Sequence, residues 1–363
     1  MDEVLALAIK VLVVDDSAFM RNMVSRYISE DNALEVIGTA RNGLQAIELT
    51  KQLAPDVITL DIEMPVMNGL DALKRIMAEK PTPVLMLSSL TETGAAATIR
   101  ALQYGAVDFI HKPSGALSFD LYKVKQDLSE KIKTAAQVSL RNLLKLKYSP
   151  LPKNQIPSSK RGLPPRHLIA IGASTGGPQA LLTVLQGLSA DFPHAIVIVQ
   201  HMPSPFTASL AERLNHNCSL TVREAEHDAR LEGGCVYIAP GDRHMNIAET
   251  GGVCRIKLHQ RPSKGLHMPS VHELFTSVSA LQGLKRHLVM LTGMGSDGAE
   301  ALAEGKAAGA ATTIAQSKES SVVFGMPRAA IETGAVDYIV DLEDIAAKLR
   351  EVTGLPSLSL SRE

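Results

Sequence analysis

The chain has 363 residues, of which 45% are hydrophobic and 21% charged, and its formal net charge is −1 at pH 7. This length favours two domains over one, and the near-neutral charge gives no bulk attraction to nucleic acid or to an anionic membrane. The three cysteines form no C-x-x-C pair, as is typical of a reducing compartment. The acidic start and the short apolar stretch after it disfavour a signal peptide, and no apolar run reaches transmembrane length, so we expect a cytoplasmic protein.

Residues 9–126 alternate strand-like and helical patterns, with Gly and Pro residues at the turns between them. The expected strands are Lys10–Val14, Leu34–Ala40, Val57–Leu60, Val84–Leu87 and Val107–Ile110. Most of these runs are apolar throughout, which is typical of parallel strands that helices cover on both faces. The pattern predicts a doubly wound α/β domain.

A helix is expected to continue over about 126–136, and the chain then becomes rich in Pro, Ser, Lys and Arg up to residue 165. That composition is typical of a solvated, semi-rigid linker. We therefore assign 127–165 to the helix end and linker, and 166–356 to a second domain.

The second domain repeats the alternation of strands and helices. Its expected strands are Leu168–Ile171, Ala195–Val199, Val236–Ala239, His287–Leu291, Ala311–Ala315 and Val336–Val340. Residues 220–260 contain short alternating segments and the pair Gly251-Gly252, which predict a β-hairpin insert. We expect a second doubly wound parallel sheet that carries this hairpin.

Polar residues stand at the carboxyl ends of the strands in the first domain. Asp15 and Asp16 follow the first strand, Asp61 the third, Ser88 the fourth and Lys112 the fifth. Because ligands of open parallel sheets bind beyond this edge, we expect these side chains to converge. Three crowded carboxylates need a divalent cation or Lys112, and Mg²⁺ suits an all-oxygen site that also handles phosphoryl groups.

Each of these motifs has a purely structural explanation when taken alone. Asp15-Asp16-Ser17 suits a helix cap, and Asp61-Ile62-Glu63-Met64-Pro65 suits a turn. Their joint placement at the strand ends is more specific, and with it residues 9–125 resemble the receiver domains of bacterial response regulators.

The receiver resemblance implies a flavodoxin-like fold in which Asp61 accepts a phosphoryl group. It implies that Mg²⁺ is held by Asp15, Asp16, Asp61 and the main-chain carbonyl of Glu63. It also places Ser88 and Phe109 at the switch positions, and Lys112 at the family's invariant lysine.

A serine motif opens the second domain. Gly172-Ala173-Ser174-Thr175-Gly176-Gly177 follows a strand and precedes a helix, which is the G-x-S-x-G nucleophile-elbow pattern. The helix start would also supply backbone N–H groups for an oxyanion. His201 and Asp297 follow two other strands, so all three side chains belong to one sheet edge. This arrangement predicts a triad of nucleophile, base and orienting carboxylate.

Alternatives remain for individual residues. Ser174 and Asp297 each suit a helix N-cap, and His201 suits an ordinary loop position. Gly293-x-Gly295-x-x-Gly298 matches a dinucleotide fingerprint, but Asp297 inside that loop would repel a pyrophosphate. Three further polar residues of the insert region could line a cleft, but we interpret them as ordinary surface groups; they are Asp242, His244 and His267.

With both halves in view, the chain resembles the CheB family of chemotaxis protein-glutamate methylesterases. The motifs that carry this resemblance are Gly-Ala-Ser-Thr-Gly-Gly, Gln-His-Met-Pro and Gly-Met-Gly-Ser-Asp-Gly-Ala. It implies a Rossmann-like catalytic domain, with Thr175 and Met294 forming the oxyanion site and pocket around Ser174. It implies hydrolysis of glutamate methyl esters on chemoreceptors without a cofactor, and glutamine deamidation in some members.

The resemblance also implies regulation. A histidine kinase would phosphorylate Asp61, and this would relieve a receiver that otherwise packs over the catalytic cleft. A monomer is expected. The alternative is a response regulator whose second domain is a non-enzymatic partner-binding module. Within that alternative, DNA binding is disfavoured because the second domain shows no basic face or recognition helix.

Overall fold

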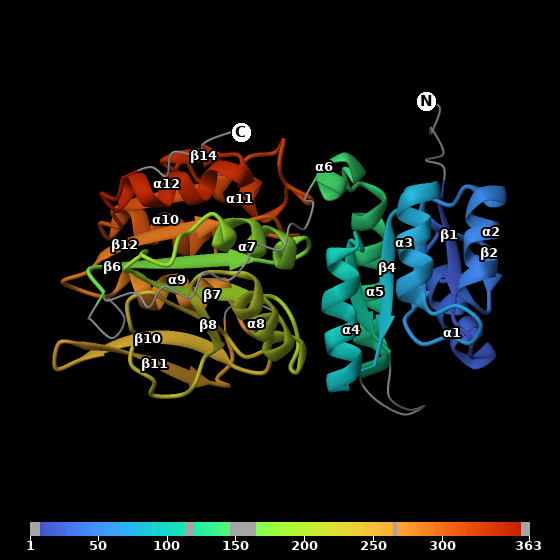
Figure 1. Ribbon diagram of the computed structural model, residues 1–363, viewed down its shortest axis with the longest axis horizontal. Coiled ribbons are helices and arrows are strands. Elements are labelled where there is room, and N and C mark those ends of the chain that lie inside the picture. Colours follow the sequence, from blue (N-terminus) through green and yellow to red (C-terminus); the bar gives the residue numbers. More distant parts are fainter. Residues whose placement is uncertain (1–7, 90, 113–119, 146–164, 264–266, 357–363) are drawn as a thin grey trace. The chain divides into compact units, whose positions relative to one another are not determined.

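The computed structural model describes residues 8–89, 91–112, 120–145, 165–263 and 267–356. The chain divides into two compact units, residues 1–145 and 146–363. Each unit is built on its own parallel sheet, which confirms the predicted fold class (Figure 1). Of the helix end and linker expected over 127–165, residues 146–164 lie outside the described residues. Among the described residues, no helix combines the length and apolar character needed to cross a membrane.

The first unit is a five-stranded parallel sheet with strand order β2-β1-β3-β4-β5. Helices α1 and α5 pack together on one face, and α2, α3 and α4 form a contiguous row on the other. Its elements are β1 Ile9–Val14, α1 Ala18–Ser29, β2 Leu34–Ala40, α2 Gly43–Leu53, β3 Val57–Asp61, α3 Gly69–Glu79, β4 Val84–Ser88, α4 Glu92–Gln103, β5 Asp108–His111, α5 Asp120–Ala136 and α6 Leu140–Lys145. The predicted strands are present, with ends that differ by one residue. The short helix α6 was not expected.

Local sequence explains where the helices of the first unit begin. Ser17, Asn42, Asn68 and Thr91 are the N-caps of α1, α2, α3 and α4, and each side chain accepts a hydrogen bond from a backbone N–H of the first turn. These are the residue types that best satisfy the unpaired donors of a helix start. The caps place the loops that precede the helices at the carboxyl edge of the sheet.

The second unit is a seven-stranded parallel sheet with strand order β14-β13-β12-β6-β7-β9-β8. Its strands are β6 His167–Ala173, β7 Ala195–Gln200, β8 Thr221–Glu224, β9 Cys235–Ile238, β12 Lys285–Met290, β13 Thr312–Gln316 and β14 Tyr338–Val340. Its helices are α7 Gly177–Gln186, α8 Phe206–Asn217, α9 Val271–Ser279, α10 Ala299–Ala307, α11 Met326–Glu332, the 3₁₀ turn η1 Leu342–Asp344 and α12 Ile345–Val352. The strand order reverses between β6 and β12, and ligands of such sheets bind at this reversal.

The hairpin insert is shorter than the sequence suggested. Strands β10 (His244–Thr250) and β11 (Val253–His259) pair antiparallel. Gly251 and Gly252 form their two-residue turn, both with positive φ, which glycine adopts without strain. Strand β8, by contrast, pairs with β9 as the parallel edge of the main sheet. The sequence placed Val236–Ala239 in the main sheet and the short segments around it in the insert, and this was wrong for β8, because a short half-exposed edge strand alternates in the same way as a hairpin strand.

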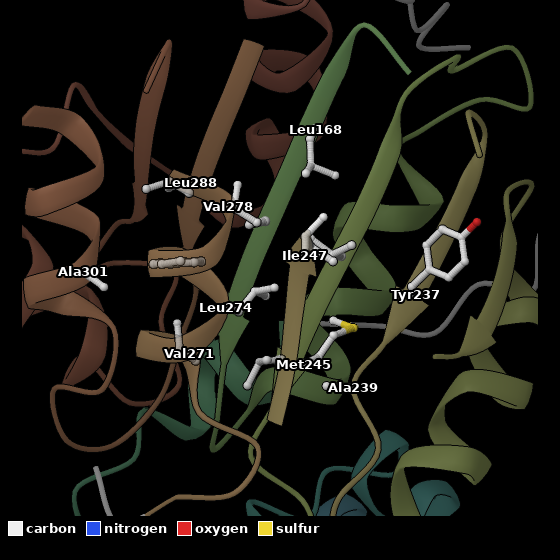
Figure 2. Packing of buried hydrophobic residues seen from close by; sticks show 14 of the residues in the cluster. Leu168, Tyr237, Ala239, Met245, Ile247, Val271, Leu274, Val278, Leu288 and Ala301 are labelled. Atoms are coloured by element: carbon white, nitrogen blue, oxygen red, sulfur yellow. The ribbon is translucent and has the colours of Figure 1, made fainter. Parts of the chain in front are cut away.

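The core of the second unit lies between the sheet and the layer formed by α9, α10 and the hairpin. Val271, Leu274 and Val278 recur along α9 at helical spacing and are fully buried. Figure 2 shows them beside Met245 and Ile247 of β10, over the strands of the sheet. This packing brings the start of α9 to the carboxyl edge of β6 and β12.

Three buried histidines gather at the opposite, amino edge of the same sheet. His167 Nδ1 lies 2.9 Å from His287 Nε2, and the His167 and His194 ring centroids are 4.5 Å apart. Burial, with repulsion from His167 and Lys285, lowers the pKa of His287 to about 4. Burial also lowers the pKa of His167.

These shifts predict that the second unit loses stability in mild acid. In the unfolded chain, His287 has a pKa of about 6.5 and binds a proton as the pH falls below that value. In the folded chain, it binds this proton only near pH 4. The free energy of unfolding should therefore fall by about 2 kcal/mol between pH 7 and pH 5 on account of this residue. We expect His287→Gln to flatten the pH dependence of Tm, measured by calorimetry. His216→Gln, an exposed histidine of α8, is the control, and equal slopes in both variants would contradict the assignment.

Candidate functional site

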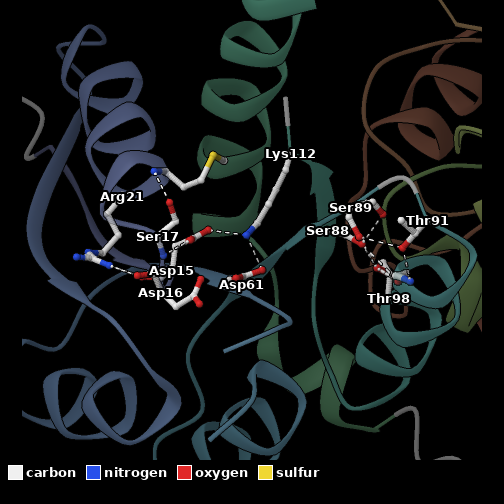
Figure 3. A network of polar contacts seen from close by, with 12 residues as sticks. Asp15, Asp16, Ser17, Arg21, Asp61, Ser88, Ser89, Thr91, Thr98 and Lys112 are labelled. Carbon is white, nitrogen blue, oxygen red and sulfur yellow. Dashed lines mark hydrogen bonds and ion pairs between the residues drawn. The ribbon is translucent and has the colours of Figure 1, made fainter. Parts of the chain in front are cut away.

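An acidic cluster lies at the carboxyl edge of the first sheet. Asp15 follows β1 and is fully buried, Asp61 is the buried last residue of β3, and Asp16 is exposed. Each offers a carboxylate oxygen within 4.8 Å of those of the others. The ammonium of Lys112, just after β5, lies 2.8 Å from Asp15 Oδ2 and 2.8 Å from Asp61 Oδ1 (Figure 3). The structure thus brings together four of the side chains that the strand ends predicted.

Lys112 neutralises only part of this negative charge. Burial, opposed by the ion pair with Lys112 and reinforced by repulsion from Asp15, raises the pKa of Asp61 to about 6. Burial alone would lower the pKa of Lys112, but its bonds to Asp15 and Asp61 raise it overall. Three carboxylates around a single ammonium leave negative charge that Lys112 does not neutralise. Their oxygens form a donor set that fits Mg²⁺. The main-chain carbonyl of Glu63 stays a predicted fourth ligand.

Arg21 supports the cluster and was not anticipated from the sequence. Its Nη1 atom donates to the main-chain carbonyls of Asp15 and Asp16, at 2.7 and 2.9 Å. The Ser17 N–H also donates to Asp15 Oδ1 at 2.9 Å. The available signal was an arginine one helical turn after the Asp-Asp-Ser cap, where its side chain reaches back over the helix start.

The two predicted switch residues have partners outside the acidic cluster. The Ser88 hydroxyl lies 2.7 Å from Thr98 Oγ1 and 3.3 Å from the Gly94 carbonyl, both on α4 (Figure 3). Phe109 is buried, and the Lys131 ammonium lies 5.3 Å from its ring centroid and donates to its carbonyl. Ser88 is therefore held by α4 in this structure.

The serine motif of the second unit forms a tight turn from β6 into α7. The Ser174 N–H donates to the Thr292 carbonyl at 3.0 Å, and the Gly177 N–H donates to the Ser174 carbonyl at 2.7 Å. Gly176 has φ +78°, and a Cβ on Gly177 would lie 1.9 Å from Gln200 Oε1. Gly176 is therefore favoured by its backbone conformation, and Gly177 by the close approach of the Gln200 side chain. Two of the helix-start donors expected for an oxyanion are already hydrogen-bonded to carbonyls.

His201 and Asp297 form a nearly buried pair beside this turn. His201 directly follows β7, and its Nε2 atom lies 2.8 Å from Asp297 Oδ2, with the two side chains 8% and 7% exposed. His201 Nδ1 is buried and has no hydrogen-bond partner among the described residues. Strands β6 and β7 are neighbours, so the pair lies at the same edge as Ser174.

The Asp297 carboxylate also caps the start of α9. It accepts hydrogen bonds from the Ser270 hydroxyl at 3.0 Å and from the N–H groups of Val271 and His272 at 2.7 and 3.1 Å. Burial would raise the pKa of Asp297, but the bonds from His201 and these backbone donors lower it to about 2. Asp297 is therefore an anion at 2.8 Å from His201 Nε2, and Nδ1 is the ring nitrogen that has no hydrogen-bond partner among the described residues.

Asp297 does cap a helix, as one alternative proposed, but the helix is α9 and not the following α10. The missed signal was Ser270-Val271-His272-Glu273, an S-x-x-E capping box at the start of an apolar-periodic run.

Thr292 ties the strand ends around the serine together. Its hydroxyl donates to the Thr175 carbonyl at 3.0 Å and accepts from the Val323 N–H at 2.9 Å. A Cβ on Gly293 would lie 2.8 Å from Ser174 Cβ, so the backbone leading to Met294 passes directly beside the serine side chain. Thr175 is therefore next to Ser174 in the chain, and the loop that carries Met294 lies beside the serine in space.

Of the two histidines interpreted as surface groups, His244 is buried, contrary to prediction, and His267 is exposed but lies against His201. His244 is 1% exposed and stacks on His259. The exposed His267 stacks on the ring of His201, with centroids 4.2 Å apart and planes inclined by 19°. The sequence could not place either, because both positions follow from how the hairpin and the start of α9 pack.

Comparisons with known proteins agree with this division of the chain. A family model described as CheB methylesterase matches residues 169–349, and one described as Response regulator receiver domain matches residues 11–119. A protein from Geobacillus kaustophilus named protein-glutamate methylesterase/protein-glutamine glutaminase is 49% identical, over 95% of this chain and 99% of its own. A protein of the same name from Bacillus subtilis is 45% identical, over 94% and 97%.

A solved structure shares the fold of the second unit. The Thermotoga maritima CheB methylesterase catalytic domain is 40% identical with a TM-score of 0.50, over 51% of this chain and 98% of that domain.

The acidic cluster makes a testable prediction about stability. Between pH 3.8 and about 6, folded Asp61 retains a proton that the unfolded chain has released. This residue therefore lowers the free energy of unfolding as pH rises through that window. In chelator-treated buffer, Asp61→Asn should stabilise the first unit by roughly 1–3 kcal/mol at pH 7 and by much less at pH 4. Denaturant unfolding checks this, with exposed Asp56→Asn as control; a destabilised Asp61→Asn at pH 7 would contradict it.

Proposed function

This chain belongs to the CheB methylesterase family, and from that membership we propose that it is a phosphorylation-activated serine esterase acting on glutamate methyl esters of chemoreceptors. The proposal rests above all on the ionised Asp297 that holds His201 next to β6, the strand that directly precedes Ser174. Because relatives are also named protein-glutamine glutaminases, we extend it to deamidation of receptor glutamines at the same site.

In the proposed reaction, His201 Nδ1 accepts the proton of Ser174 Oγ as this oxygen attacks the ester carbonyl carbon. Asp297 stabilises the resulting imidazolium. His201 then returns the proton to the departing methoxy oxygen, and methanol leaves an acyl-serine. Water, activated by His201, attacks this acyl-serine and releases the glutamate carboxylate.

The oxyanion that forms in this reaction needs hydrogen-bond donors beside Ser174. The Ser174 and Gly177 N–H groups already donate to carbonyls. The start of α7 therefore does not supply these two donors to the oxyanion. We assign the role to Thr175, which directly follows the serine, and to Met294, whose loop passes beside the serine side chain at Gly293. Donors fixed by the Thr292 bonds would be preorganised for the transition state.

Regulation is proposed to act through Asp61. Its carboxylate would accept a phosphoryl group from a histidine kinase, with Asp15, Asp16, Asp61 and the Glu63 carbonyl holding Mg²⁺. The ion, when bound, would neutralise phosphoryl oxygens. Lys112 already contacts Asp61, and it would pair with the added negative charge. Phosphorylation would shift the protein toward its active conformation.

The enzyme is tested by methanol release from methylated receptor membranes. Ser174→Ala should lower the rate by about 10³-fold or more, because no other group would replace the nucleophile. Ser296→Ala, an exposed serine on the loop that carries Asp297, should retain activity. Full activity in Ser174→Ala would refute the nucleophile, and no release from the wild type would favour a binding module instead.

The switch is tested with a small acyl-phosphate donor and Mg²⁺ in the same assay. The donor should raise methanol release by the wild type, but should not do so in Asp61→Asn, which keeps the basal rate. Asp56→Asn, at the other end of β3, should respond like the wild type. Activation of Asp61→Asn by the donor would show that the phosphoryl group acts elsewhere.

A further inference from the structure

The segment that leads into α9 contacts both members of the His201–Asp297 pair. His267 stacks on the His201 ring, with centroids 4.2 Å apart. Three residues later, Ser270 is the N-cap of α9 and donates to Asp297 Oδ1 at 3.0 Å. Residues 267–270 therefore contact both the face of the His201 imidazole and the Asp297 carboxylate that is hydrogen-bonded to it.

The His201 ring needs such a constraint for the proposed chemistry. Its hydrogen bond to Asp297 fixes one edge of the ring, at Nε2. The torsion that rotates a histidine ring has broad minima, so a single bond leaves the direction of Nδ1 loosely defined. A second ring stacked within van der Waals distance on one face opposes rotation out of the plane.

From this geometry we propose that His267 is a positioning residue, which holds the His201 ring so that Nδ1 stays directed toward Ser174. This inference rests on the proposed esterase function for its kinetic consequences. His267 is exposed, so its ring contributes little to the core. The stacking therefore serves the orientation of His201, where a misplaced base reduces the rate of the chemical step.

The first test compares His267→Ala with His267→Phe in methanol release by the full chain. The alanine variant should lose about 10-fold or more in kcat with KM within about twofold of the wild type. The phenylalanine variant keeps a flat ring and should recover most of kcat. The matched control is His216→Ala, which removes an exposed histidine from α8.

Three outcomes would overturn the proposal. They are an unchanged kcat in His267→Ala, a raised KM at constant kcat, and equal loss in both variants. The second would make His267 a substrate contact, and the third would mean that its nitrogens are needed and not its ring.

A second test does not depend on catalysis. The imidazole N–H proton that His201 shares with Asp297 should give a downfield NMR signal. It should broaden or shift in His267→Ala and persist in His267→Phe and in Ser174→Ala. A signal unaffected by His267→Ala would refute the positioning role, whatever the esterase assays show. Conversely, an inactive wild type with the expected spectra would reject the esterase and leave the ring contact established.

Discussion

Both sites of this chain depend on how a buried carboxylate is compensated. Removing a carboxylate from water is costly unless hydrogen-bond donors or cations replace the lost hydration. Asp297 receives donors from His201, Ser270 and the first turn of α9, and its pKa falls to about 2. Asp61 shares one ammonium with Asp15, and its pKa rises to about 6. Asp297 is therefore an anion suited to orienting a base. The negative charge of Asp61 is only partly compensated, which favours binding of a further cation.

Parallel topology is what delivers these groups to one edge. In the second sheet, β12, β6 and β7 are adjacent, so the loops that follow them carry Asp297, Ser174 and His201 to neighbouring positions. Close approach of the loops then requires glycine, as at Gly293, where a Cβ would lie 2.8 Å from that of the serine. The Thr292 hydroxyl links the same loops, because it donates to the Thr175 carbonyl and accepts from the Val323 N–H.

The sequence predicts the features that follow from hydrophobic periodicity and from the residues at strand ends. Apolar runs predicted both sheets, and the polar residues after them predicted the acidic cluster and the Ser174, His201 and Asp297 edge. It was insufficient where partners come from distant segments. Ser270 reaches Asp297 across 27 positions, and His267 meets His201 only because α9 packs on the sheet. Likewise, the edge strand β8 has the alternation of a hairpin strand, and only pairing with β9 distinguishes the two.

The contact between Ser88 and Thr98 bears on how much a phosphoryl group at Asp61 would have to supply. If Ser88 turned toward that group, it would exchange the bond to Thr98 for one to a charged oxygen. Such an exchange is worth about 1–2 kcal/mol, whereas moving an equilibrium from 1:99 to 99:1 takes about 5.5 kcal/mol. The serine alone therefore cannot drive the switch. Under the proposed regulation, the larger contribution would come from the new charge itself, through its pairing with Lys112 and with the cation that the three aspartates would hold.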